Sequence, residues 1–365
     1  MKKSILVLVS LLMAMSLFMT ACQTATPSAA ATTAAAETTV AAAATTEAAP
    51  ATAATSVAET PAATSGALTE VTIVGDWPTP WVGWIPWLVA QEKGFYADEG
   101  LKVTTVVPAT VADPPKYVAT GKADFAYTTQ LDVTLGRAAG IPIKSVAAVF
   151  RYNNWGVIIP ADSSVKELKD IKTISLYENT WDQSSFKAMM AYAGLDISKV
   201  NILPASSDTV PLLLTKKADA IGGITDAEQT EVKVTGKIDT KILMAHDYGV
   251  PDVYIYVLAS SDDYLKKNPE IAKKFLAATM KGLQYSVENP DEALAIFQKL
   301  YPDALDADYA KASWEATLPV LKAEVYGVQD KNLWATAQNF MLKYNLIDKE
   351  SPVDDLFTNE YIPSK

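Results

Sequence analysis

GKADFAY, residues 121–127, leaves a short helix and enters an apolar strand, and KKADAIGG, residues 216–223, does the same in the second half of the chain. Each copy is a unit of small helix, lysine, Ala-Asp and strand. A helix followed at once by a strand is the repeating element of α/β proteins, in which helices connect the strands of one sheet. The two copies therefore indicate an α/β fold made of two similar halves.

The same alternation extends outward from both copies. In the first half it predicts strands at 70–75, 102–107, 123–127, 143–150 and 156–159, and helices at 84–93, 114–120 and 130–139. In the second half it predicts helices at 165–169, 182–193 and 209–216, and strands at 172–176, 200–204, 218–221 and 254–259. The chain then turns helical, with helices predicted at 269–289, 290–300 and 331–344. Strands joined through helices predict parallel crossovers.

Two α/β halves that are joined twice and followed by helices predict a two-lobed clamshell. The expected crossings lie near 159–166 and 258–265, so residues 67–160 with 262–365 form one lobe and residues 161–261 form the other. In open α/β sheets, ligands bind at the carboxyl ends of the strands. We therefore expect a binding crevice where the strand ends of the two lobes face each other.

The first 66 residues do not share this pattern. Two lysines, an apolar run and Thr20-Ala21-Cys22 form the arrangement of a secretory signal peptide, residues 1–22. Cys22 is the only cysteine, and its place after the run resembles a bacterial lipobox, in which the cysteine is lipidated; the alternative is an ordinary signal peptide with an incidental cysteine. Residues 23–66 are rich in Ala and Thr without any aromatic residue, which predicts a disordered tether. We expect an extracytoplasmic protein that is anchored to the cell membrane by a lipid on Cys22.

The charged residues of the chain indicate which classes of partner and ligand are not expected. The formal net charge is −11, so nucleic acid is not expected as a partner. The chain contains two arginines, Arg137 and Arg151, although arginine is the usual bidentate partner of sulfonate, phosphate and carboxylate groups. This scarcity disfavours a strongly anionic ligand.

GDWPTPWVGWIPW, residues 75–87, holds four of the chain's eight tryptophans together with three prolines. It joins the first predicted strand to the first predicted helix, at the expected edge of the crevice. Prolines stiffen such a loop and indoles present flat apolar faces, which suits a planar heterocycle. Trp87 is expected to point into the core, whereas Trp84 fits the core and the site equally well.

Aromatic residues also follow other strands, and the candidate ligand-binding set is Trp77, Trp81, Tyr127, Tyr152, Trp155, Tyr177 and Trp181. Tyr152 and Trp155 could instead pack the hinge.

The sequence lacks the usual motifs of catalysis and metal binding. It has one histidine, His246, and contains no HExxH, CxxC or Walker A pattern and no GxGxxG after a strand. Gly222-Gly223, at a strand end, could donate backbone N–H groups to an anion, but two glycines are a weak signal. We therefore expect a binding protein, without catalytic residues, cofactor or metal.

WLVAQEKGFYADEGLKVTTVV, residues 87–107, resembles the opening of the periplasmic substrate-binding proteins of ABC importers, in the sulfonate, nitrate and thiamine-pyrimidine superfamily. ATGKADFAYTT and GRAAGIPIKSVAAVF fit the next two units of that pattern. Three later stretches resemble the thiamine pyrimidine precursor branch: ADAIGGITDAEQTEV (218–232), HDYGVPDVY (246–254) and VDDLFTNEYIP (353–363). The Asp-Trp of that branch is present as Asp76-Trp77, but its Asn and His before the first helix are absent.

This resemblance implies a type II, Venus-flytrap periplasmic-binding-protein fold that captures a small heterocycle, of the formylaminopyrimidine or hydroxymethylpyrimidine type, by closure of its lobes. A pyrimidine with an exocyclic amine also needs acceptor carboxylates, for which Asp76, Glu178 and Glu228 are the candidates. The resemblance further implies a monomer that docks on an ABC permease served by separate ATPase subunits. Other readings remain open: an alkanesulfonate, nitrate-like or flavin-like ligand in the same fold, a pyrimidine-synthesising enzyme of related fold, and a surface sensor or adhesin.

Overall fold

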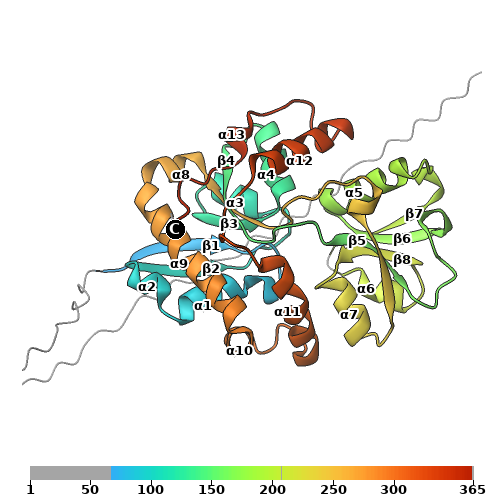
Figure 1. Ribbon diagram of the computed structural model, residues 1–365, viewed down its shortest axis with the longest axis horizontal. Coiled ribbons are helices and arrows are strands. Elements are labelled where there is room, and N and C mark those ends of the chain that lie inside the picture. Colours follow the sequence, from blue (N-terminus) through green and yellow to red (C-terminus); the bar gives the residue numbers. More distant parts are fainter. Residues whose placement is uncertain (1–66, 207, 364–365) are drawn as a thin grey trace, which may run out of the picture. The chain divides into compact units, whose positions relative to one another are not determined.

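The computed structural model describes residues 67–206 and 208–363, in which ten strands form two five-stranded sheets (Figure 1). The predicted signal peptide, Cys22 and the tether at 23–66 lie outside these described residues. Within the described ranges, no helix combines the length and the apolar character needed to cross a membrane. Both sheets belong to one compact unit of the chain.

The first sheet has the strand order β2-β1-β3-β10-β4. Its strands are β1 (Thr69–Val74), β2 (Leu101–Val106), β3 (Phe125–Thr128), β4 (Ile143–Ala148) and β10 (Val257–Ser261). Strand β1 runs parallel to β2 and β3, whereas β10 lies antiparallel between β3 and β4. The helices from the first part of the chain that accompany this sheet are α1 (Ile85–Glu92), α2 (Phe95–Asp98), α3 (Pro114–Ala119) and α4 (Gln130–Ala138).

The second sheet repeats this arrangement with the order β7-β6-β8-β5-β9. Its strands are β5 (Trp155–Pro160), β6 (Thr173–Tyr177), β7 (Asn201–Ala205), β8 (Ala220–Ile224) and β9 (Thr240–Met244). Strand β6 is parallel to β7 and β8, and β5 lies antiparallel between β8 and β9. In the green to yellow part of Figure 1, this sheet is accompanied by α5 (Thr180–Tyr192), α6 (Val210–Leu214) and α7 (Glu228–Val234).

Two strands differ from the sequence prediction in direction and in partner. Strand β5 was expected in the lobe of residues 67–160, yet it belongs to the second sheet. Strand β10 was expected in the lobe of residues 161–261, yet it belongs to the first sheet, and both strands are antiparallel to their neighbours. Almost every residue of both strands is buried, so their apolar runs marked them as strands without indicating a direction or a partner. The chain therefore crosses between the sheets before β5 and before β10, ahead of the predicted crossings.

The two Ala-Asp units found in the sequence make equivalent contacts in the two sheets. Asp124 Oδ2 accepts hydrogen bonds from the backbone N–H (2.7 Å) and the hydroxyl (2.9 Å) of Thr72 in β1. Asp219 Oδ2 accepts hydrogen bonds from the backbone N–H groups of Thr173 in β6 (2.9 Å) and of Lys172 (3.1 Å). Each aspartate thus fixes the strand that follows it beside the first parallel strand of its sheet.

The helices that precede these two strands also end alike. The backbone N–H groups of Lys122 and Lys217 bond back to carbonyls inside α3 and α6, at 2.8 and 2.9 Å. This is the Schellman cap, in which the residue just past the helix takes a positive φ. That residue is Gly121 (φ 69°) in the first copy and Lys216 (φ 57°) in the second. The second copy therefore keeps the backbone of the unit with a residue that is poorly suited to it.

Helices from the last third of the chain complete the fold. The 20-residue α9 (Pro269–Glu288) places Phe275 on Phe125 of β3, with the two rings stacked and their centroids 3.9 Å apart. Its Thr279 hydroxyl lies 2.7 Å from the hydroxyl of Tyr96 in α2. The remaining helices are α8 (Asp262–Lys267), α10 (Pro290–Leu300), α11 (Ala307–Leu321), α12 (Lys331–Lys343) and α13 (Val353–Leu356).

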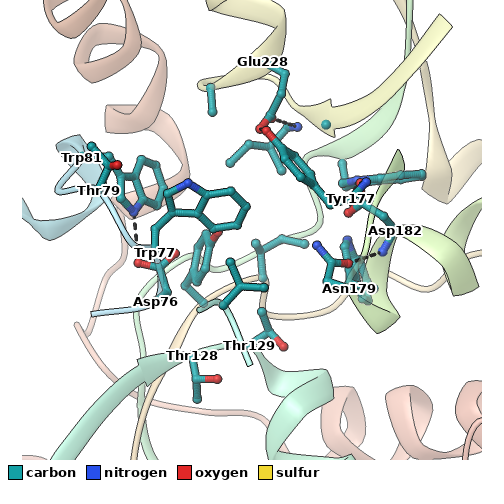
Figure 2. A pocket seen from close by; sticks show the side chains of 18 of the residues that line it. Asp76, Trp77, Thr79, Trp81, Thr128, Thr129, Tyr177, Asn179, Asp182 and Glu228 are labelled. Atoms are coloured by element: carbon teal, nitrogen blue, oxygen red, sulfur yellow. Dashed lines mark hydrogen bonds between the residues drawn. The ribbon is translucent and has the colours of Figure 1, made fainter. Parts of the chain in front are cut away.

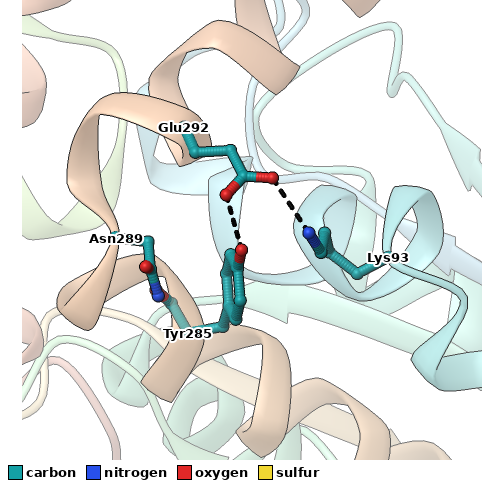
Figure 3. Close-up of polar contacts among 4 residues, drawn as sticks. All are labelled: Lys93, Tyr285, Asn289 and Glu292. Carbon is teal, nitrogen blue, oxygen red and sulfur yellow. Dashed lines mark hydrogen bonds and ion pairs between the residues drawn. The ribbon is translucent and has the colours of Figure 1, made fainter.

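A surface cluster joins α10 to α9 and to the end of α1 (Figure 3). Glu292 Oε1 accepts a hydrogen bond from Lys93 Nζ at 2.9 Å, and its Oε2 accepts one from the Tyr285 hydroxyl at 2.5 Å. The ammonium of Lys93 also lies 4.7 Å from the centroid of the Tyr285 ring. The side chains of Lys93 and Glu292 are 32% and 50% exposed, so this ion pair is expected to contribute little stability. The cluster nevertheless connects the three helices at the surface.

Candidate functional site

A cleft of about 410 Å³ opens at the carboxyl ends of the parallel strands of both sheets (Figure 2). Segments that follow β1 and β3 line it from the first sheet, and segments that follow β6 and β8 line it from the second. The lining is completed by residues after β2 (Val111, Ala112, Pro114), after β7 (Asp208), before β10 (Ile255, Tyr256) and at the start of α11 (Leu305, Tyr309). This is the position at which ligands bind in open α/β sheets, and it is where the sequence predicted a crevice.

The tryptophan-rich stretch divides between the core and the cleft. Trp84 and Trp87 are 0% and 1% exposed, as was expected for Trp87. Trp77 and Trp81 line the cleft and are only partly buried. Gly75, at the start of the stretch, lets the backbone pass the Trp84 indole, because a Cβ at this position would lie 2.0 Å from the ring. The loop is therefore held by two core indoles and presents the other two to the cleft.

Asp76 connects these two groups of indoles. Its Oδ1 accepts hydrogen bonds from Trp84 Nε1 at 2.7 Å and from Trp81 Nε1 at 3.0 Å. The residue is 6% exposed, and none of the described residues donates a hydrogen bond to its Oδ2. Burial raises the pKa of the Asp76 carboxyl from 3.8 to about 6, against the opposing effect of the two indole N–H groups. Asp76 thus positions Trp81, and its second oxygen is buried near the Tyr256 hydroxyl without a well-aligned donor among the described residues.

Aromatic rings from both sheets meet at the cleft. Trp77 contacts Tyr177 edge to face, with ring centroids 5.1 Å apart. Trp81 packs against Tyr256, at 5.5 Å between centroids, and Tyr256 in turn stacks on Tyr127 at 4.8 Å. Indole and phenol rings in this arrangement provide flat apolar faces with polar handles, which suits a planar ligand.

The wall from the second sheet is built around two buried carboxyl groups. Asp182 Oδ1 accepts a hydrogen bond from Trp155 Nε1 at 3.1 Å, and Glu228 accepts one from the Tyr177 hydroxyl and one from the backbone N–H of Ile224, both at 2.9 Å. Burial is the main cause that raises the pKa of each group to about 7. In Figure 2 both residues lie across the cleft from Asp76.

The two glycines singled out in the sequence have a packing role beside this wall. A Cβ on Gly222 would lie 2.7 Å from the Trp155 ring, and one on Gly223 would lie 2.6 Å from Cβ of Glu228. Glycine at these positions lets Trp155 and Glu228 approach β8 closely. The pair thus shapes the cleft through the side chains that it allows to approach.

Asp226, which is outside the cleft lining, connects the second sheet to α11 and to the segment that passes between the two sheets just before β5. Its carboxylate accepts hydrogen bonds from Asn154 Nδ2 at 2.6 Å and from the Thr317 hydroxyl at 2.7 Å. The Ser313 hydroxyl donates to its backbone carbonyl at 2.5 Å. Asp226 is 0% exposed, and this burial raises its pKa to about 6. This cluster ties the C-terminal helices to the second sheet.

Most of the predicted site residues come together in the cleft. Those that line it are Asp76, Trp77, Trp81, Trp155, Tyr177, Glu178, Trp181 and Glu228. Two others do not line it. Tyr127 is 0% exposed and lies behind Tyr256, and Tyr152 is 38% exposed outside the lining. His246 is also outside the lining, with its side chain 45% exposed beside Asp247.

Several residues of the cleft were missed by the sequence reasoning. The amide N–H of Asp182 donates to Asn179 Oδ1 at 2.7 Å, so the Asn-x-x-Asp pattern of a helix N-terminus was an available signal. Glu231 follows Glu228 by three residues on α7, and this spacing places both on one helix face. Tyr309 comes from α11, and only the tertiary fold brings it to the strand ends.

The charged residues of the described lining are all acidic. It contains no lysine, arginine or histidine, and its seven carboxylates are Asp76, Asp132, Glu178, Asp182, Asp208, Glu228 and Glu231. Among the described residues, no three His, Cys, Asp or Glu side chains converge in a way that could hold a metal ion. Carboxylates accept hydrogen bonds and repel anions, so the cleft favours a ligand rich in N–H donors or positive charge.

Comparison with protein families matches residues 81–293 to the family described as NMT1/THI5 like. A formylaminopyrimidine-binding protein of Halalkalibacterium halodurans is 28% identical over 280 residues, covering 74% of this chain and 84% of that protein. The riboflavin-binding protein RibY of Chloroflexus aurantiacus is 26% identical over 301 residues, covering 78% and 84%. A 4-amino-5-hydroxymethyl-2-methylpyrimidine phosphate synthase of Legionella pneumophila is 23% identical over 316 residues, covering 82% and 95%.

Among solved structures, the periplasmic aliphatic sulphonate binding protein SsuA of Escherichia coli superposes with a TM-score of 0.64. The sequence identity is 15%, and the match covers 80% of this chain and 99% of SsuA. At this identity the likeness shows the fold, which is that of the periplasmic binding proteins, as the sequence resemblance implied.

Proposed function

The chain belongs to the NMT1/THI5-like family, and from this membership and its acidic, aromatic cleft we propose that it is an extracytoplasmic solute-binding protein for an aminopyrimidine. The formylaminopyrimidine-binding relative supports this ligand class. The proposed ligand is a thiamine pyrimidine precursor of the formylaminopyrimidine or hydroxymethylpyrimidine type.

The observation that carries the proposal is the pairing of flat rings with buried carboxylates at opposing strand ends. In the proposed pose, the pyrimidine ring lies against Trp77 and Trp81, and its exocyclic amine donates to a carboxylate. Asp76 has an oxygen with no donor among the described residues, which makes it the first candidate acceptor. Tyr177 and Trp155 are fixed by Glu228 and Asp182, so the opposite wall is preorganised for binding.

The transport step is part of the same proposal. Closure of the two sheets around the two chain crossings would bury the ligand, as in other hinged binding proteins. The closed form would then dock as a monomer on an ABC permease served by separate ATPase subunits. A lipid on Cys22 and the tether at 23–66 would hold it at the membrane face.

A flavin-like heterocycle is the second candidate ligand. The RibY relative favours it, and so does the number of aromatic side chains along the cleft. One relative is named as a pyrimidine phosphate synthase, so the third candidate is an enzymatic function, synthesis of a pyrimidine, rather than a ligand. An alkanesulfonate or nitrate-like ion is disfavoured, because the carboxylates of the lining would repel it.

The test is a thermal-shift titration with 4-amino-5-hydroxymethyl-2-methylpyrimidine, its formylaminomethyl analogue, riboflavin and taurine. A ligand present at about 100 times its Kd should stabilise the protein by roughly 2.7 kcal/mol. We expect the pyrimidines to raise Tm and taurine to have no effect. A response to taurine with none to any heterocycle would refute the proposal, and pyrimidine phosphate formed by the protein alone would establish an enzyme.

A further inference from the structure

The Glu231 carboxylate lines one part of the cleft wall and takes part in none of the hydrogen bonds described above. Glu228, Glu231 and Asp208 line the cleft together, from α7 and from the segment before α6. Both oxygens of Glu228 accept hydrogen bonds, from the Tyr177 hydroxyl and from the Ile224 N–H. The Glu231 carboxylate receives neither a hydrogen bond nor an ion pair from any residue that the structure describes.

The surroundings of Glu231 disfavour its negative charge. Burial first, and then the nearby charges of Asp208 and Glu228, raise its pKa to about 7. Tyr309 of α11 lines the same part of the cleft and offers a ring face and a hydroxyl, but no positive charge. A cation at this place would offset both the lost hydration and the repulsion between like charges.

An independent feature of the same cleft points to a donor-rich ligand. Asp76, which is 6% exposed, has an oxygen that accepts no hydrogen bond from the described residues. Two acidic residues of the lining therefore keep acceptor capacity, Asp76 after β1, whose second oxygen is buried near Tyr256, and Glu231 in α7. Because no described cluster of acidic side chains could hold a metal ion, an organic ammonium fits these acceptors better than a divalent cation.

We propose that the cleft selects ligands that carry a protonated amine, with Glu231 and Asp208 receiving the ammonium while the aromatic rings hold the planar part. This inference rests on the proposed function and specifies, in addition, that the substituent on the bound heterocycle is positively charged. The lining also contains aromatic rings, whose faces attract cations through their quadrupoles.

The test compares two compounds that differ only in the group on the 5-methylene arm, a protonated amine or a neutral hydroxyl: 4-amino-5-aminomethyl-2-methylpyrimidine and 4-amino-5-hydroxymethyl-2-methylpyrimidine. Their Kd values are measured with the full chain by isothermal titration calorimetry at neutral pH. We expect the aminomethyl compound to bind at least tenfold more tightly. Glu231→Gln should remove this preference, so that the two compounds bind with Kd values within about twofold of each other.

Two further variants complete the experiment. Asp208→Asn, which keeps an oxygen to accept from the Val210 N–H, should weaken binding of the amine even if Glu231→Gln does not fold. Asp162→Asn changes an exposed carboxylate outside the lining and should alter neither Kd. Equal affinities for the two compounds, or a preference that survives in both cleft variants, would overturn the inference alone. If neither pyrimidine binds, the proposed function fails and the inference fails with it.

Discussion

Asp76 is the residue at which the core and the cleft of this protein meet. One of its oxygens holds Trp84, which is fully buried, and Trp81, which lines the cleft. A change in the core packing around Trp84 should therefore shift Trp81, the ring that we expect to contact the ligand. Trp77 does not take part in this hydrogen bonding, which makes it a cleaner probe of binding than Trp81.

Substitution of two tryptophans should separate binding from folding. Trp77→Ala should weaken binding of the hydroxymethylpyrimidine by about 1–3 kcal/mol, the range known for base–aromatic stacking. Trp87→Ala should instead lower the free energy of unfolding by about 3–5 kcal/mol, because its indole is 1% exposed. The measurements are a fluorescence titration and a thermal melt of each variant without added ligand.

Trp81→Ala is the internal comparison for this pair. Because Trp81 bonds to Asp76 and packs on Tyr256, its removal should affect both affinity and stability. If Trp77→Ala destabilised the protein as much as Trp87→Ala and left affinity unchanged, the stacking assignment would be wrong.

At the residue scale, the sequence located the cleft better than it described its lining. Tyr177 ends strand β6, and Trp77 and Glu228 come shortly after strands; since strand ends converge in an α/β sheet, their positions could be inferred. Tyr127 follows the same rule, yet its ring points behind Tyr256, because rotamers and layering are set by packing. The acidic character of the lining was not predictable, since it depends on which of many Asp and Glu residues converge.

At the scale of single elements, the two Schellman caps offer a matched pair of substitutions. Lys216→Gly should raise the free energy of unfolding by about 1 kcal/mol, because it relieves a side chain at φ 57°. Gly121→Lys places the same strain in the other copy and should lower stability by a similar amount. Chemical denaturation with urea measures both. A destabilising Lys216→Gly would show that the lysine side chain makes a compensating interaction.

The attachment of α11 to the second sheet can be tested through Thr317. Thr317→Val keeps the shape of the side chain but removes the hydroxyl that donates to the buried carboxylate of Asp226. Loss of a donor to a buried charged group should cost about 1–3 kcal/mol of stability at neutral pH. Thermal melts at pH 5 and pH 8 should show a smaller loss at pH 5, because a protonated Asp226 needs the donor less. An equal loss at both values would contradict this assignment.

The elements themselves were largely predictable, but their pairing was not. Strong apolar runs and glycine-terminated helices marked nearly all strands and the early helices. The direction of β5 and β10 depends on contacts between distant segments, which no local pattern encodes. Strand β9 was missed because all of its residues are only partly buried, so its sequence has no contrast between two faces.

For the whole molecule, the buried carboxyl groups predict that stability falls as pH rises. Burial holds the pKa of Asp76 and of Asp226 at about 6, and that of Asp182 and of Glu228 at about 7, above their ordinary values. The folded chain therefore binds more protons than the unfolded chain between about pH 4 and pH 7. The stability that these protons supply is full below about pH 4 and is lost as pH rises through 6 and 7.

Thermal melts without added ligand at pH 5 and pH 8 test this sign, and we expect the lower Tm at pH 8. A carboxyl group whose pKa rises from 3.8 to about 6, such as Asp76, contributes about 3 kcal/mol to this pH dependence. Asp226→Asn should flatten the profile, since the amide cannot titrate. A Tm that increases from pH 5 to pH 8 would mean that these carboxyl groups are better hydrated than their burial indicates.

The exchange of β5 and β10 between the two sheets bears on the order in which the chain can fold. The second sheet is complete once residue 244 is available, because all of its strands lie between residues 155 and 244. The first sheet needs β10, at residues 257–261, inserted between two strands that precede residue 150. Contacts so distant in sequence slow folding, since a long loop must close before they form. We therefore expect the first sheet, whose other strands lie between residues 69 and 148, to be completed only by a strand that follows the whole second sheet in the chain.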